Sequence, residues 1–140
     1  MRKLPGTLLL LGALGMPALG WAQAQAYPTQ ELLSTSTTVL GETIRYPDSG
    51  PARVTASIVT IAPGAETVFH RHPAPMFAYI LEGEVSVDYG DQGIRVFRQG
   101  EALMEAMQAR HRGTNQGSVP VRILSVHMGA AGTENVVLEK

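Results

Sequence analysis

Residues 64–83 read GAETVFHRHPAPMFAYILEG, and residues 100–115 read GEALMEAMQARHRGTN. The first stretch contains His70 and His72 and the second contains His111, so three of the four histidines lie in these two stretches. Side chains alternate between the two faces of a β-strand, so His70 and His72 project to one side while Arg71 points away. The pattern predicts that two imidazoles face one pocket and that His111 supplies a third from a distant strand.

The chain outside these stretches also has the pattern of β-structure. From Val39 to Met128, short runs of Val, Ile, Tyr, Phe and Thr are separated by glycine and proline, which is typical of a sandwich or barrel. Pro73-Ala74-Pro75 must turn the chain, and Glu82-Gly83 predicts a tight, hairpin-like connection with positive φ at the glycine. We therefore expect an all-β fold without helices, with strands over residues 53–61, 76–81, 84–89, 94–97, 102–107 and 119–128.

The N-terminal 24 residues have the features of an export signal. Arg2 and Lys3 precede an apolar stretch, and Ala22-Gln23-Ala24 is a cleavage site of the small-x-small type. Pro5 and Pro17 bound the apolar stretch, which is shorter than the roughly 20 residues that a membrane span needs. We expect cleavage after Ala24 rather than an uncleaved anchor, a periplasmic or secreted location, and no membrane span in the mature chain.

The mature chain has room for one domain. Residues 25–38 are rich in Gln, Ser and Thr and are expected to form a flexible N-terminal arm. The domain itself is expected over residues 39–130. The tail, residues 131–140, contains Val136, Val137 and Leu138, which favour an edge strand or a strand exchanged with a partner. Pairing of such edges predicts a homodimer.

Composition excludes several kinds of site and partner. Loss of the signal removes two of the 11 basic residues and leaves nine against 12 acidic residues, which argues against a nucleic-acid partner. The chain has no cysteine, so disulfides and thiolate ligands are absent. A metal must therefore be held by nitrogen and oxygen, or weakly by methionine sulfur. Neutral imidazole suits zinc, iron, copper, nickel and, less strongly, manganese.

The two histidine stretches resemble the two sequence motifs of the cupin superfamily. In the first, Gly64 is followed after five residues by His70-x-His72, after three more by Met76 and after six more by Gly83. The second runs from Gly100 to Asn115, with Ala106 where proline is usual, Gln108 where glycine is usual, and His111. The resemblance implies a small single-domain bacterial cupin, a double-stranded β-helix or jelly roll, with His70, His72 and His111 binding a metal inside its open end.

The main departure from the cupin pattern is Met76, which occupies the position of the glutamate ligand. A thioether is a soft and weak donor, so we expect Met76 to fill the pocket wall rather than to bind the ion, and Met104 and Met107 to lie in the core. Three neutral imidazoles leave the charge of a divalent ion uncompensated. The open coordination positions should therefore favour hydroxide or an anionic, bidentate substrate.

Glu105 is the candidate replacement for the missing carboxylate. If it is buried beside the ion, it becomes a fourth ligand or a general base. Strand alternation places Glu105 with Leu103 and Met107, but both faces of residues 101–107 carry apolar side chains, so the inward face stays undecided. A solvent-exposed glutamate is the alternative.

Other residues are weaker candidates for the pocket. Phe77 and Tyr79 alternate with their neighbours in a strand and would line a substrate pocket or pack in the core. Arg110, like Arg112, flanks His111 and would clamp an anionic substrate or stay solvated. For the remaining polar residues of interest, His127 and Asn115, we expect structural roles based on hydrogen bonds.

The leading functional hypothesis is an exported cupin that holds one divalent transition metal, Fe, Mn, Zn or Ni with iron preferred, and acts on a small anionic or bidentate substrate. Its three-histidine set resembles that of thiol dioxygenases and diketone-cleaving oxygenases, which implies a mononuclear non-haem dioxygenase. The alternatives are a metal-dependent isomerase and a non-catalytic cupin that binds a small ligand or a partner.

Overall fold

Strands dominate the structure, and the prediction of an all-β chain is confirmed. The computed structural model describes residues 27–139, so the predicted signal peptide over residues 1–24 lies outside the described residues. From Glu31 onward the described chain forms one unit. Its one helical element is a short 3₁₀ turn, η1 (Gly90–Gln92). Between residues 27 and 139, no helix has the length and apolarity needed to cross a membrane.

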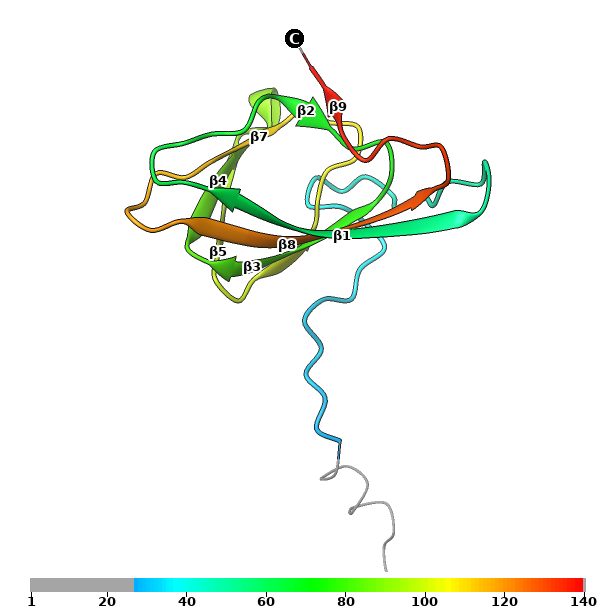
Figure 1. Cartoon of the computed structure of the whole chain (residues 1–140), viewed down its shortest axis with the longest axis horizontal. Helices are drawn as coiled ribbons and strands as arrows, with labels where there is room; N and C mark the ends of the chain where they lie inside the picture. The colour runs from blue at the N-terminus through cyan, green and yellow to red at the C-terminus, as the bar shows by residue number, and fades with distance from the viewer. Residues whose placement is uncertain (1–26, 140) are drawn as a thin grey trace, which may run out of the picture. The chain divides into compact units, whose positions relative to one another are not determined.

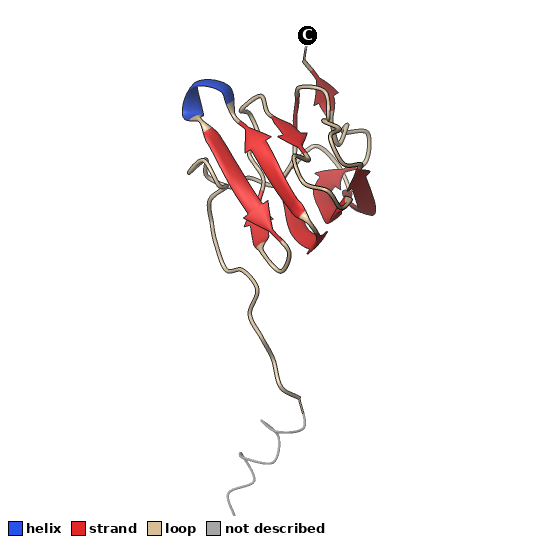
Figure 2. Ribbon diagram, turned by 90° about the vertical axis from the view of Figure 1, so that its left-hand side faces the viewer, coloured by secondary structure: helices blue, strands red, loops and turns tan. Residues whose placement is uncertain are grey.

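The strands form two main sheets and one short pair. The four-stranded sheet has the order β1-β8-β3-β6, the three-stranded sheet has the order β5-β4-β7, and β2 pairs with β9. Figure 1 shows β1 and β8 crossing the molecule together, with β2 and β9 at its upper edge, and Figure 2 shows the β4–β5 hairpin closed by η1. The strand bounds are β1 Ala52–Ile61, β2 His70–Arg71, β3 Met76–Glu82, β4 Glu84–Asp88, β5 Ile94–Arg98, β6 Ala102–Met104, β7 Arg112–Thr114, β8 Val121–Ala130 and β9 Val137–Leu138.

The core lies between the two main sheets. Ile80 on β3 and Val121 on β8 are fully buried from one sheet, and Val85 on β4 is buried from the other. Each of these side chains contributes about 1.5–3 kcal/mol by leaving water. Along β3, residues 76, 78 and 80 are buried while the residues between them are half-exposed, which is the alternation expected for a strand with one core face.

The connection at Glu82-Gly83 differs from the predicted hairpin. β3 pairs with β6 and β8, whereas β4 pairs with β5 and β7, so the chain passes from one sheet to the other at Gly83. Gly83 has φ of 77°, and a Cβ at this position would lie 2.8 Å from the carbonyl oxygen of Pro120. Only glycine fits both the left-handed backbone and the close approach of the neighbouring chain.

The strand predicted over residues 102–107 ends earlier, at Met104. The Glu105 carboxylate accepts a hydrogen bond from the backbone N–H of Ala106, at 2.7 Å, and the next N–H groups turn toward Glu42. The backbone groups that would extend the ladder are thus used by side-chain carboxylates. Residues 105–110 form a loop instead.

The C-terminal tail lies against the first histidine stretch. Arg71 on β2 is directly opposite Val137 on β9, and the N–H of Glu139 donates to the carbonyl of Phe69 at 2.9 Å. An ion pair of 2.7 Å between Arg71 and Glu139 strengthens the same contact. Residues near the C-terminus therefore help to hold the histidine-bearing strand.

We predict that Gly83→Ala lowers the free energy of unfolding by about 3 kcal/mol or more, because it adds the cost of a left-handed alanine to a clash with backbone atoms. The matched control is Gly90→Ala, since Gly90 also has positive φ but a Cβ there would meet no atom within 4 Å. The control should lose only about 1–2 kcal/mol. Urea denaturation of both variants measures the difference, and equal losses would contradict the packing argument.

Candidate metal centre

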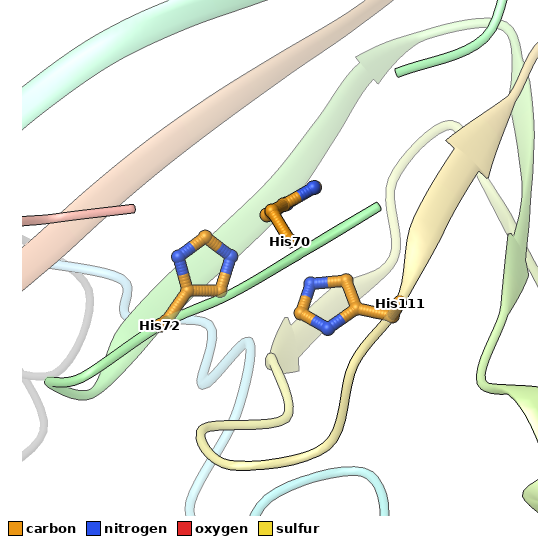
Figure 3. Close-up of side chains that lie close together, drawn as sticks. All are labelled: His70, His72 and His111. Atoms are coloured by element: carbon orange, nitrogen blue, oxygen red, sulfur yellow. The ribbon is translucent and has the colours of Figure 1, made fainter. Parts of the chain in front are cut away.

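The centre is built on a short antiparallel pairing between the two histidine stretches. The N–H of His70 donates to the carbonyl of His111 and the N–H of His111 donates to the carbonyl of His70, each at 2.9 Å. Residues directly opposite each other in such a pair place their side chains on the same face. His72, two residues after His70, shares this face. The backbone therefore brings the three imidazoles together, as Figure 3 shows.

The three rings form a compact triangle. Their centroids are 5.0 Å apart for His70 and His72, 4.6 Å for His70 and His111, and 5.1 Å for His72 and His111. One nitrogen from each ring lies within 4.8 Å of the corresponding atom of the other two. His72 and His111 are buried and His70 is half-buried, so the group could hold one metal ion away from bulk water.

Backbone carbonyls fix the orientation of all three rings. Nδ1 of His70 is 2.8 Å from the carbonyl of Val68, Nδ1 of His111 is 2.8 Å from that of Ala109, and Nδ1 of His72 is 2.9 Å from that of Asn135. A carbonyl only accepts hydrogen bonds, so each Nδ1 carries the proton and each Nε2 has a free electron pair. For His72 and His111, the buried Nε2 has no partner among residues 27–139. A metal ion satisfies such nitrogens, so the donor set fits one.

Glu105 is turned inward, which decides the question left open by strand alternation. Its side chain is buried, and its Oε1 accepts hydrogen bonds from the Tyr89 hydroxyl at 2.6 Å and from the Ala106 N–H at 2.7 Å. Its Oε2 lies 4.0 Å from Nε2 of His111. Burial raises the pKa of Tyr89, and the neighbouring carboxylate adds to the rise, so Tyr89 stays a protonated donor. Tyr89 is a site residue that the sequence analysis missed.

The imidazoles and Glu105 lie at one cavity between the two main sheets. Its volume is about 290 Å³. Met76 is part of the wall, beside apolar side chains from β1, β4 and β8. The cavity is lined by Val59, Ile61, Thr67, Val68, His70, His72, Met76, Val85, Val87, Glu105, His111, Gly113, Ile123, Ser125, His127, Val136 and Leu138.

Three predicted pocket residues lie elsewhere. Phe77 lines a separate cavity on the other face of β3, with Met104 on the neighbouring strand, and Tyr79 shares that face by strand alternation. Arg110 stacks over the ring of Phe69, with its guanidinium carbon 3.8 Å from the ring centroid. Residues on either side of a pocket-facing histidine point away from it, which is why the structure does not bring Arg110 into the cavity.

His127 lines the cavity, and the hydrogen bond expected of a structural histidine is not made by its Nδ1 within residues 27–139. It is directly opposite Met76 in the pairing of β3 with β8, and its ring centroid is 5.2 Å from that of His72. Its buried Nδ1 has no hydrogen-bond partner in the described part of the chain. Strand alternation with Ile123 and Ser125 was the signal that could have placed it. Asn115, by contrast, ties down backbone groups as predicted, donating to the carbonyl of Ile61 at 2.9 Å.

The electrostatics favour neutral imidazoles. Burial lowers the pKa of His72 to about 3; the carbonyl of Asn135 opposes this shift, and the other imidazoles add to it. Burial also lowers the pKa of His70 and of His127, and in both cases repulsion from a neighbouring histidine contributes. Unprotonated rings at neutral pH are the form that binds a metal.

Glu42 holds the loop that precedes His111. Its carboxylate accepts hydrogen bonds from the N–H groups of Met107, Gln108 and Ala109, at 2.7, 2.9 and 3.3 Å. Burial alone would raise the pKa of Glu42, but the backbone donors outweigh it and the pKa is lowered. This loop carries the Ala109 carbonyl that orients His111, so Glu42 acts on the centre through the backbone.

We predict that the metal-free protein loses stability as the pH falls below about 6.5. The unfolded chain binds a proton on His72 that the folded chain excludes until about pH 3, so this residue alone should cost about 2 kcal/mol at about pH 5. Urea denaturation of chelator-treated protein at about pH 7 and about pH 5 measures the loss. The His72→Gln variant should show a smaller slope. A flat wild-type profile would contradict the burial of neutral imidazoles.

Comparison with known proteins agrees with this geometry. Residues 57–127 match the family model of the cupin domain, which spans both histidine stretches. The chain is also 34% identical over 67 residues to the tetracenomycin polyketide synthase protein TcmJ of Streptomyces glaucescens. The aligned region is 47% of this chain and 44% of that protein, so the chain spans less than half of this relative.

Two solved structures have a similar fold. The oxalate decarboxylase of Lactobacillus farciminis, in complex with formate, matches with a TM-score of 0.53 and 23% identity over 61% of this chain and 26% of that chain. The polyketide cyclase RemF of Streptomyces resistomycificus matches with a TM-score of 0.52 and 24% identity over 70% of each chain. At this identity the likenesses show the fold alone. With a family match over half of its length and a jelly-roll fold around three converging histidines, this chain belongs to the cupin family.

Proposed function

We propose that this cupin is an enzyme that binds one divalent transition metal through His70, His72 and His111 and transfers a proton within a substrate that carries two neighbouring oxygens. The observation that supports the metal is the pairing of each Nδ1 with a backbone carbonyl, which leaves three Nε2 atoms free for one ion. Iron, manganese, zinc and nickel all suit this ligand set, with iron preferred. When bound, the ion supplies Lewis-acid polarisation of a substrate oxygen.

Glu105 is the proposed general base. Among the described residues that line the cavity, it is the one carboxylate, and its Oε2 faces the cluster while Tyr89 and the Ala106 N–H hold its Oε1. A carboxylate fixed in this way can take a proton from the carbon or hydroxyl beside a polarised carbonyl. The reaction class is therefore that of an isomerase or cyclase.

An oxygenase is the second candidate. It is favoured by the ligand set itself, because an ion held by three neutral imidazoles, with a methionine at position 76 in place of a carboxylate, would have room for both a substrate and dioxygen. Oxygen consumption distinguishes the two classes. A cupin that only binds a small ligand or a partner would show neither proton transfer nor oxygen consumption. Export to the periplasm or medium and a homodimeric state remain predictions from the sequence.

We predict about one metal ion per chain in untagged protein, and a loss of at least about tenfold in metal content in His111→Ala, because the site would lose one of its three protein ligands. The matched control is His127→Ala, which removes an imidazole that packs against His72 but leaves all three proposed ligands in place, and should keep its metal. Elemental analysis by mass spectrometry measures both. A metal content near zero in wild type, or one unchanged in His111→Ala, would refute the site.

We predict that Glu105→Gln slows proton transfer at least about 100-fold while the metal content stays at the wild-type level, because the amide keeps its size but is not a base. The assay follows exchange of the α-protons of 2-hydroxyacetophenone with deuterated water by NMR, alongside oxygen consumption. Thr67→Ala is the control, since Thr67 lines the same cavity but carries no base. Exchange at the wild-type rate in Glu105→Gln would exclude the proposed base, and substrate-dependent oxygen consumption would favour the oxygenase.

A further inference from the structure

We infer that the substrate is a largely apolar molecule of about two fused rings, with its two oxygens together at one end. The position of the oxygens rests on the metal proposed above. The apolar part rests on the cavity alone. The inference therefore narrows the expected substrate from any small anion to one whose polar atoms are confined to the end that meets the histidines.

The ionisable groups of the cavity lie together, and its two hydroxyls are bonded to backbone: Thr67 accepts from the N–H of Gly113 at 3.0 Å, and Ser125 donates to the carbonyl of Ser57 at 3.4 Å. His70, His72 and His111 form the centre of the ionisable group. Glu105 adjoins it, with its Oε2 4.0 Å from Nε2 of His111. His127 adjoins it as well, with its ring centroid 5.2 Å from that of His72. Within residues 27–139, no lysine or arginine lines this cavity. A phosphate or a second carboxylate of a ligand would thus lose its hydration without gaining a cation. It would also face the Glu105 carboxylate.

The walls beyond the histidines are apolar on both sides. β1 and β8 contribute Val59, Ile61 and Ile123 from the larger sheet, and β4 contributes Val85 and Val87 from the smaller one. These side chains offer no hydrogen bonds to a sugar or a polyol. They offer favourable contact to rings and hydrocarbon chains, at roughly 25 cal/mol per Å² of apolar surface removed from water.

The mouth of the cavity is also apolar, although it faces water. Val68 is 63% exposed and Leu138 is 68% exposed, and Val59 and Val136 are partly exposed beside them. Exposed apolar side chains that gather at the rim of a cavity mark a binding site for an apolar ligand. A ligand that reached from the histidines to this rim would cover them.

The volume sets the size of the molecule. An apolar cavity of roughly 150 Å³ accommodates one benzene ring. The cavity here is about 290 Å³, close to twice that volume, so two fused rings fit. An oxalate-sized ligand would leave most of the apolar wall without a partner.

Three probes separate the two parts of the inference. 1-Hydroxy-2-acetonaphthone has two fused rings and two neighbouring oxygens, 2-acetonaphthone has the rings without the hydroxyl, and oxalate has the oxygens without the rings. Titration calorimetry with metal-loaded protein should show the hydroxynaphthone binding at least about tenfold more tightly than either of the others. Oxalate binding as tightly as the hydroxynaphthone would overturn the inference.

A matched pair of variants locates the apolar contact. Val68→Asn at the rim should weaken binding of 2-acetonaphthone about three- to tenfold, because the ring covers this side chain. Val54→Asn, on the outer part of β1, changes a valine of almost equal exposure, 66%, that does not line the cavity, and should leave binding unchanged. Thermal unfolding and metal content confirm that both variants remain folded. Equal effects in the two variants would overturn the inference.

Chelator-treated protein separates this inference from the proposed function. 2-Acetonaphthone should bind with the same dependence on Val68 whether or not metal is present, since the apolar wall does not involve the ion. If the protein as purified contained no metal and still bound 2-acetonaphthone, the metal centre would be refuted and the apolar substrate would stand. Metal at about one ion per chain with no binding of either naphthone would refute the apolar substrate alone.

Discussion

The structure depends on one reciprocal pair of backbone hydrogen bonds, between His70 and His111. These two residues are far apart in the sequence, and each donates its N–H to the carbonyl of the other. A shift of either strand by one residue would turn its histidines to the opposite face. The neighbouring bonds, from the N–H of Gly64 to the carbonyl of Asn115 and from that of His72 to Met107, extend over the same two segments and prevent such a shift.

Around this pair, backbone carbonyls rather than side chains fix the orientation and the protonated nitrogen of each imidazole. Three carbonyls from three segments, at Val68, Ala109 and Asn135, set which nitrogen of each ring is protonated. Two side-chain carboxylates add to this arrangement, one by holding a loop and one by lying next to the imidazoles. Glu42 holds the loop that contains Ala109, and Glu105 stands beside the histidines themselves. The centre is therefore held in place before any ion or substrate binds, which reduces the entropic cost of binding.

The sequence predicted the all-β fold, the cupin family and the convergence of His70, His72 and His111, because all three follow from short-range patterns. It did not predict the crossing between sheets at Gly83, since a tight glycine turn looks the same whether it joins paired or unpaired strands. The face of Glu105 stayed undecided, because it depends on a contact with the distant Tyr89 that no local pattern reveals. For His127, the alternation with Ile123 and Ser125 was present in the sequence, but nothing local showed that this face of the strand lines the cavity.

The tail after β8 has two roles at the centre: it orients one of the histidines, and it lines the cavity. Its Asn135 carbonyl orients His72, while Val136, just before β9, and Leu138, opposite His70 in the pairing of β9 with β2, form part of the mouth. Changes in the composition of these few residues would alter which molecules enter while the imidazoles stay in place. Such a division would let substitutions in a short terminal segment change ligand selectivity while the three histidines keep their arrangement.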